Sequence, residues 1–235
     1  MSALSRWVAV VATLAAALAV AAPAGATNEC DGLMVCVPVA GPWVVVSTAR
    51  DVPRRQVQYQ LTCPRAHVVG GLDAELSRRA IDVGFFGALG SPVNPGITTS
   101  RSVVFVGSFV GASADSATFR PHIGCVPASG DGGRVPTSVT AFPPGQPTVR
   151  RVRTARVRPG SVTVAQGCRA NERLVGAAHA FGFFTRRAPD AGLVASVTGV
   201  RTIRDGRVRV VTRGDAELAG VRAVVQVQAV CSRVR

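Results

Sequence analysis

The sequence predicts an all-β protein built from two tandem, disulfide-stapled modules, each a β-sandwich or a barrel-like fold. Two observations predict this fold class. Apolar and polar residues alternate in runs that end at cysteines, which is the pattern of half-buried strands. The cysteines also recur in two nearly equal pairs, 62 residues apart in the first and 63 in the second. This spacing indicates a tandem duplication, and the four residues are Cys63, Cys125, Cys168 and Cys231.

Residues 1–26 have the features of a secretory signal peptide. Arg6 supplies a positive charge, Trp7 to Ala22 is an apolar run, and a small-residue cleavage site ends at Ala26. We therefore expect cleavage after Ala26 and a secreted, extracellular protein. The apolar run is shorter than the roughly 20 residues of a membrane-spanning helix, and no later segment is apolar over such a length. No transmembrane segment is expected after removal of the signal.

Six cysteines at paired spacings in an exported chain predict three disulfides. The expected pairs are Cys30–Cys36, Cys63–Cys125 and Cys168–Cys231. Closing a loop of about 60 residues contributes roughly 4 kcal/mol in the loop-entropy model, and the short N-terminal loop about 2 kcal/mol. A zinc site is disfavoured because there is no CxxC pair and the histidines are scattered singly, at His67, His122 and His179. We expect no metal and no cofactor.

Counting back in twos from a cysteine gives the residues that share its face of a strand. These residues are apolar before Cys63 and Cys231, whereas the residues between them are mostly polar. We therefore expect the cysteines to point into the core and the polar residues to lie on the opposite face of half-buried strands. These polar residues are Gln58, Gln60, Gln226 and Gln228.

Asp205-Gly206 is the strongest turn signal in the chain. It lies between two β-branched runs and predicts a two-residue type I′ hairpin. Counting outward from this turn pairs Arg204 with Arg207, and Thr202 with Arg209, on one face of the hairpin.

Other segments between the cysteines predict further strands and one helix. Val103–Val110 with Thr118–Gly124 has a hairpin-like arrangement, and so has Val208–Thr212 with Val221–Val230. Asp73–Ala80 is the best helical candidate.

A Gly- and Pro-rich stretch divides the mature chain, as expected of a linker between domains. The expected divisions are an N-terminal Cys30–Cys36 segment (27–41), module 1 (42–127), the linker (128–146) and module 2 (147–235).

The cysteine separation is in the range of an immunoglobulin domain, but no tryptophan follows the first cysteine of either module. The chain instead resembles a Cys-framed β repeat of exported proteins of high-GC Gram-positive bacteria. The resemblance is carried by Cys63 with Val68-Val69-Gly70-Gly71 and by the run from Val225 to Cys231. In the second copy, Leu174-Val175-Gly176-Ala177 lacks the second glycine. The resemblance implies the fold and export, and no activity.

The charge is distributed unevenly between the halves of the chain. All 27 basic residues are arginine. Residues 27–127 hold 8 Arg against 7 acidic residues, whereas residues 128–235 hold 18 Arg against 6. Module 1 is therefore nearly neutral and module 2 strongly basic.

Two places concentrate the excess arginine. Where the first copy has Trp43-Val44-Val45-Val46, the second has Thr148-Val149-Arg150-Arg151 and continues to Arg158. The other place is the Asp205-Gly206 hairpin, where like charges opposite each other should favour a bound anion. The candidate polyanion-binding residues are Arg150, Arg151, Arg153, Arg204, Arg207 and Arg209.

These arginines predict a partner that is an acidic polymer or a cell-envelope component, such as a cell-wall polymer, nucleic acid or an anionic surface. The alternative is that arginine keeps an exposed edge strand from pairing and keeps an exported protein soluble. A protein partner is also considered, with the loop at 90–96 as its candidate contact. The sequence does not determine the oligomeric state.

The sequence favours a non-enzymatic binding or cell-surface structural protein. In Gly107-Ser108-Phe109-Val110-Gly111 the serine stands in the wrong place for a GxSxG elbow, and no HExxH or Walker loop occurs. The alternative is a secreted hydrolase with a site between the modules. Convergence of His67 or His179 with an acidic residue would favour that alternative.

Overall fold

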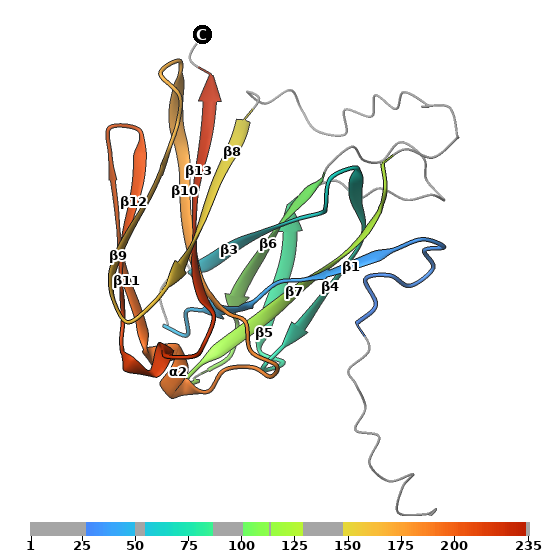
Figure 1. Ribbon diagram of the computed structural model, residues 1–235, viewed down its shortest axis with the longest axis horizontal. Helices are drawn as coiled ribbons and strands as arrows, with labels where there is room; N and C mark the ends of the chain where they lie inside the picture. Colours follow the sequence, from blue (N-terminus) through green and yellow to red (C-terminus); the bar gives the residue numbers. More distant parts are fainter. Residues whose placement is uncertain (1–26, 50–54, 87–100, 113, 129–147, 234–235) are drawn as a thin grey trace, which may run out of the picture.

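The computed structural model describes residues 27–49, 55–86, 101–112, 114–128 and 148–233, and nearly all of its elements are strands (Figure 1). The predicted signal peptide, the loop at 90–96 and the predicted linker beyond its first residue lie outside these residues. In the described part of the chain, no helix combines the length and apolarity needed to cross a bilayer.

The first sandwich consists of two antiparallel sheets. In one, β7 lies between β4 on one edge and β1 followed by β2 on the other. In the other, β6 lies between β3 and β5. The strands are β1 (Val37–Ala40), β2 (Trp43–Val46), β3 (Gln56–Thr62), β4 (His67–Leu76), β5 (Ile81–Phe86), β6 (Ser102–Phe109) and β7 (Ala117–Pro127).

The second sandwich has the same order of pairing. Strand β13 lies between β10 and β8, and β12 lies between β9 and β11. Both sandwiches are open, so the sandwich rather than the barrel-like form is observed. The elements are β8 (Thr148–Val157), β9 (Gly160–Gly167), β10 (Glu172–Phe183), α2 (Ala191–Ala195), β11 (Val197–Arg204), β12 (Arg207–Gly214), η1 (Ala216–Leu218) and β13 (Ala223–Arg233).

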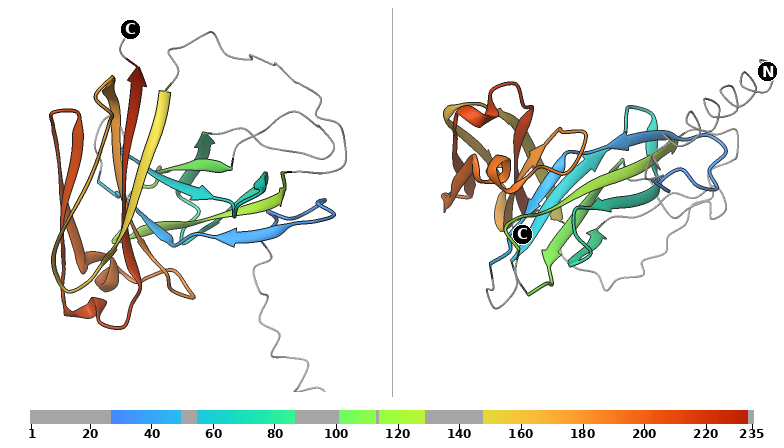
Figure 2. Two further views of the ribbon diagram at one scale, coloured as in Figure 1. Left: turned by 45° about the horizontal axis from the view of Figure 1, so that its top comes forward. Right: turned by 90° about the horizontal axis from the view of Figure 1, so that it is seen from below.

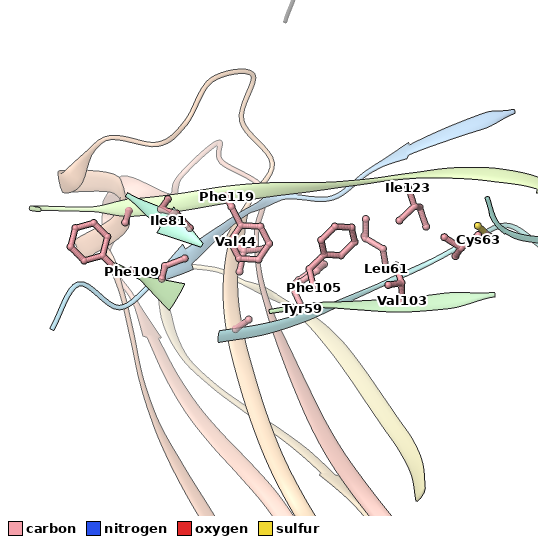
Figure 3. Close-up of a cluster of buried hydrophobic side chains, with 14 of the residues drawn as sticks. Val44, Tyr59, Leu61, Cys63, Ile81, Val103, Phe105, Phe109, Phe119 and Ile123 are labelled. Carbon is pink, nitrogen blue, oxygen red and sulfur yellow. The ribbon is translucent and has the colours of Figure 1, made fainter. Parts of the chain in front are cut away.

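All three predicted disulfides are confirmed. Cys63 directly follows β3 and Cys125 lies in β7, so this bridge joins the two sheets of the first sandwich. Cys168 and Cys231 join the second sandwich in the same way. Figure 3 shows Cys63 at one end of the core of the first sandwich. Phe105, Phe119 and Ile123 lie along this core, between its two sheets.

The two sandwiches share one continuous sheet. Strand β2 also pairs with β10, through Val44 opposite Gly182 and Trp43 opposite Phe183, which gives a seven-stranded sheet. The two cores lie on opposite faces of this sheet, because Ala180 of β10 belongs to the first core and Phe183 to the second. The strands of the two halves run in different directions (Figure 2).

Strand β3 of the first sandwich lies against the outer face of β13. The backbone N–H of Gln60 donates to Gln226 Oε1 at 2.7 Å, and Gln226 Nε2 donates to the carbonyl of Gln60 at 3.0 Å. Gln228 Nε2 donates to the carbonyl of Gln58 at 3.1 Å. The expectation that these glutamines lie on an exposed face is therefore wrong for β13, where Gln228 is fully buried. The side-chain amides bind the backbone groups of an edge strand, which would otherwise be unpaired.

The Asp205-Gly206 hairpin is confirmed. Both residues have positive φ, 52° and 69°, and Arg204 pairs with Arg207 and Thr202 with Arg209 as predicted.

The two other hairpin predictions are wrong, because β6 and β7 belong to different sheets, and so do β12 and β13. Alternation identifies a strand and its buried face but not its neighbour, and these connections cross from one sheet of a sandwich to the other. The helix expected over Asp73–Ala80 is also absent. Its first four residues continue β4, because pairing with β7 outweighs local helix propensity.

A β-bulge marks the same place in each sandwich. The register shifts between Val69 and Gly71 in β4 and between Leu174 and Gly176 in β10. Gly71 therefore corresponds to Gly176. The comparison of Val68-Val69-Gly70-Gly71 with Leu174-Val175-Gly176-Ala177, which placed Gly71 opposite Ala177, is wrong by one residue.

Strand β8 corresponds to β1 and β2 together. Cys125 pairs with Val37, and Cys231 pairs with Val149. Further along the same strands, Phe119 pairs with Val44, and Val225 with Ala155. Arg150 and Arg151 therefore take the places of two β1 residues rather than those of Val45 and Val46, and the proposed replacement of the buried strand β2 by a basic strand is wrong.

Candidate anion-binding face

Four arginines lie on the outer face of the β11–β12–β9 sheet. We call this set the basic face: Arg204, Arg207, Arg209 and Arg213. All four side chains are exposed, whereas Val208, Val210 and Thr212, which alternate with them, are fully buried. Alternate residues of a strand lie about 7 Å apart. Strand β12 therefore holds the guanidinium groups in a row while its other face anchors it in the second core.

Val211 separates Arg209 from Arg213 on this face, with Val200 beside it on β11, and the residues that flank the two arginines themselves are short. Arg209 lies between Thr202 on β11 and Ala165 on β9, and Arg213 lies between Thr198 and Ser161. Short neighbours leave the guanidinium groups accessible from both sides. Among the residues that the structure describes, no carboxylate lies within ion-pair distance of the four arginines. The row is therefore an exposed cationic surface, and the described part of the chain supplies no counter-ion to it.

Arg150 lies instead at the junction between the sandwiches. One of its guanidinium nitrogens donates to Gln58 Oε1 at 2.7 Å and also to Gln228 Oε1. Partial burial lowers the pKa of this guanidinium. The residue links β3, β8 and β13.

Arg151 is engaged by a carboxylate. Its guanidinium donates to both oxygens of Glu172, with the shortest distance 2.7 Å, and the Arg169 N–H also donates to Glu172 at 2.9 Å. The hydrogen bonds from Arg151 and Arg169 lower the pKa of Glu172. The carboxylate lies beside the sulfurs of Cys168 and Cys231, but a disulfide offers no thiolate to a metal.

The six predicted arginines thus fall into three environments. Arg204, Arg207 and Arg209 share the basic face, whereas Arg150 and Arg151 have partners within the chain. Arg153 is exposed on β8, in the other sheet of the sandwich. Arg213 was not among the predicted residues, although its spacing of four residues from Arg209 places it on the same face of β12.

A histidine and two carboxylates converge at an unexpected place in the first sandwich. His122 Nδ1 lies 3.7 Å from Glu29 Oε1, and His122 Nε2 lies 3.4 Å from Glu75 Oε1. His67 instead contacts the carbonyl of Arg65 at 2.9 Å, and His179 packs edge-on against Phe181. His122 and Glu29 are both about 5% exposed, so their contact is closed to a substrate.

At the junction between the sandwiches, the hydrogen bonds join amides, Arg150 and Thr154. Gln228 Nε2 donates to Gln226 Oε1 at 2.7 Å, and Gln226 Nε2 also contacts the Thr154 hydroxyl at 3.4 Å. No carboxylate or histidine takes part in these bonds among the described residues. The groups at this junction are paired with each other, as in a structural contact.

Comparisons of the sequence with protein-family models and with curated proteins, and of the fold with solved structures, find no match.

Proposed function

We propose that the protein is a secreted, non-enzymatic binding protein of the cell surface that binds acidic polymers through the basic face. One observation carries the proposal: four exposed arginines stand on one face of a sheet, with short residues flanking Arg209 and Arg213 and no counter-ion among the described residues. Like charges held this close are mutually repulsive, and an anion placed over them removes that repulsion. Arg153 belongs to a separate surface and is not part of the proposed site.

The chemistry of the face favours a linear polymer with repeated phosphate or carboxylate groups. A guanidinium donates hydrogen bonds in a fixed fork that matches both groups, and its charge persists at any physiological pH. The face has no aromatic side chain, so base stacking is not part of the proposed recognition. Binding should therefore depend on charge density and be insensitive to nucleotide sequence.

The proposed location follows from the signal-peptide features of residues 1–26 together with the three disulfides, which persist in oxidising compartments. We also infer that the two sandwiches are copies of one unit, in which the second has acquired the charged surface. The common pairing order and the equivalent bulges support this inference.

The test is retention of the oxidised mature chain on immobilised polyphosphate and on immobilised teichoic acid across a salt series. The variant Arg204→Gln/Arg207→Gln/Arg209→Gln is compared with Arg173→Gln/Arg186→Gln/Arg187→Gln, which removes three exposed arginines outside the basic face. We expect salt-sensitive retention that the first variant loses and the second keeps. Equal losses in both variants would mean that net charge, and not this face, determines binding.

A further inference from the structure

The outer face of the β10–β13 pair is where the second sandwich is held by the first. Ala180 packs into the first core, the Pro42 ring lies on Gly182, and Gln228 is covered by β3 and Arg150. The contact is not symmetric, because one sandwich contributes its β2 and β3 edges, whereas the other contributes the edge of β10 and the outer face of the β10–β13 pair. Contacts of this head-to-tail kind can repeat along a chain of units.

In the first sandwich, the corresponding face of β4 and β7 is covered by the N-terminal segment. We call residues 28–36 the cap. The Asn28 N–H donates to Asp73 Oδ2 at 2.8 Å, and the Glu29 side chain meets His122. His122 occupies the position of Gln228, three residues before the second cysteine of its sandwich. At this position both sandwiches thus bury a polar side chain under a segment from outside.

Two glycines make room for the cap. The carbonyl of Glu29 lies so close to Gly71 and Gly124 that a Cβ on either residue would overlap it. The two glycines are paired across β4 and β7. In the second sandwich their positions are held by Gly176 and Val230, and among the described residues a Cβ on Gly176 would meet only the Val230 side chain. The glycine pair is therefore required by the cap and not by the sheet.

At the other end of the molecule, β8 and β9 are the terminal strands of their sheets among the described residues. They are the counterparts of β2 and β3, with which the first sandwich holds the second. Strand β8 exposes Arg153 and Arg156, whereas the face beneath the cap carries Asp73 and Glu75. The free edge and the capped face are thus of opposite charge, although Arg120 beside Glu75 offsets part of the difference.

We propose that the cap blocks head-to-tail self-association. When the cap is displaced, the β4–β7 face of one molecule binds the β8–β9 edge of a second copy of the chain. This contact would resemble the one within the molecule, in which the β10–β13 face binds the β2–β3 edge. Terminal caps with this role are a general requirement of proteins built from stacked repeats. This inference does not depend on polyanion binding.

The decisive variant is Gly124→Val, which gives β7 the residue found at the equivalent place in β13. The valine side chain should displace the cap. The sheet should stay paired, because Val230 occupies the equivalent position of β13 and pairs with β10. We expect faster hydrogen exchange in residues 28–36 and, by light scattering, a rise in mass from one chain to two or more with concentration. Gly176→Ala is the matched control, since a Cβ there meets only ordinary contacts, and it should stay at the mass of the native protein.

A second pair of measurements keeps the proposal testable if Gly124→Val does not fold. Gly71→Ala displaces the same carbonyl from the other strand, and Cys30→Ser/Cys36→Ser loosens the cap without altering the sheet. Adding Arg153→Glu and Arg156→Glu to a cap-displaced variant should abolish its association. A displaced cap, shown by hydrogen exchange, in a protein that remains a single chain at all concentrations would overturn the proposal. Association that persists after the two charge reversals would also contradict it.

Discussion

The two sandwiches have the same strand order, the same disulfide and the same bulge, yet their outer surfaces have different roles. The outer face of β7 in the first sandwich carries His122 and Gly124 beneath the N-terminal segment, whereas Gln228 and Val230 take these positions under β3 in the second. On the opposite sheet, β12 exposes a row of arginines where β6 is almost wholly buried.

This difference separates the residues that specify the fold from those that specify contacts. Inward-facing residues are predominantly apolar in both halves, because each sandwich must fill its own core. Outward-facing residues are free to differ, and in this chain they determine what covers each face. Four predictions test the comparison, beginning with the largest expected effect.

The two cores should differ in their sensitivity to truncation. Phe119 is fully buried against Gly107, and Val225 holds the equivalent position of the second sandwich. Phe119→Ala should lower the free energy of unfolding by about 3–5 kcal/mol. Val225→Ala should cost about 1.5–3 kcal/mol because less apolar surface is lost. Denaturant melts of both variants measure the two losses in free energy of unfolding. Equal losses would contradict the view that Phe119 and Val225 occupy equivalent positions in similarly packed cores.

The single tyrosine of the chain, Tyr59, is buried in the core of the first sandwich. Burial raises the pKa of Tyr59 to about 12, an effect that the charge of Arg222 partly offsets. Since the folded protein holds this proton more tightly, the stabilisation is present below pH 10 and is lost as the pH rises through about 12. The two pKa values differ by about 2 units, which corresponds to roughly 2–3 kcal/mol.

Ultraviolet titration should therefore give a tyrosinate midpoint near 12 in the native protein and near 10 in denaturant. Tyr59→Phe should abolish the signal and remove this part of the stability loss at high pH. A native midpoint near 10 would mean that the ring is accessible to solvent.

The amide contacts at the junction should couple the two sandwiches. Gln228→Ala leaves the carbonyl of Gln58 and a guanidinium N–H of Arg150 without their partner, which should cost about 1–3 kcal/mol. The control is Gln166→Ala in β9, whose amide oxygen accepts from the adjacent Gly167 N–H and from no other residue that the structure describes. Calorimetry should show one unfolding transition for the native protein and separated transitions for Gln228→Ala. A single unshifted transition in that variant would contradict a coupling role.

The smallest of these effects concerns the ion pair beside the second disulfide. Because its hydrogen bonds lower the pKa of Glu172 in the folded protein, the carboxylate stabilises the fold above its ordinary pKa. This contribution should disappear as the pH falls through the lowered value. Glu172→Gln should therefore be less stable than the native protein at neutral pH and nearly equal to it in strong acid. Thermal melts at both pH values test this, and a constant difference would count against the ion pair.

Much of the architecture could be predicted because it depends on local pattern. Alternation before Cys63 and Cys231 correctly placed both cysteines in the core, and Asp205-Gly206 fixed the register of the one hairpin predicted from a tight turn. The partners of β6 and β12 could not be predicted. A strand has the same alternation whether its neighbour in the sheet precedes or follows it along the chain.

The candidate site was predictable only in part, for a related reason. Arg204, Arg207 and Arg209 share a face through the register of a single turn, and Arg213 extends that face by parity alone. The partners of Arg150 lie about 80 or more residues away in the sequence, on β3 and β13. Polar alternation looks the same whether water or another strand covers the outer face, so the covered face of β13 left no local signal.

The most direct test of the basic face is nuclear magnetic resonance of the arginine Nε–Hε groups during titration with a short polyphosphate. Binding at this face predicts saturable shifts confined to Arg204, Arg207, Arg209 and Arg213, which vanish when the first three are replaced by glutamine. Arg173, Arg186 and Arg187 serve as exposed reporters outside the face and should not move. Shifts spread evenly over all exposed arginines, or largest at Arg153, would contradict a specific binding surface on β12.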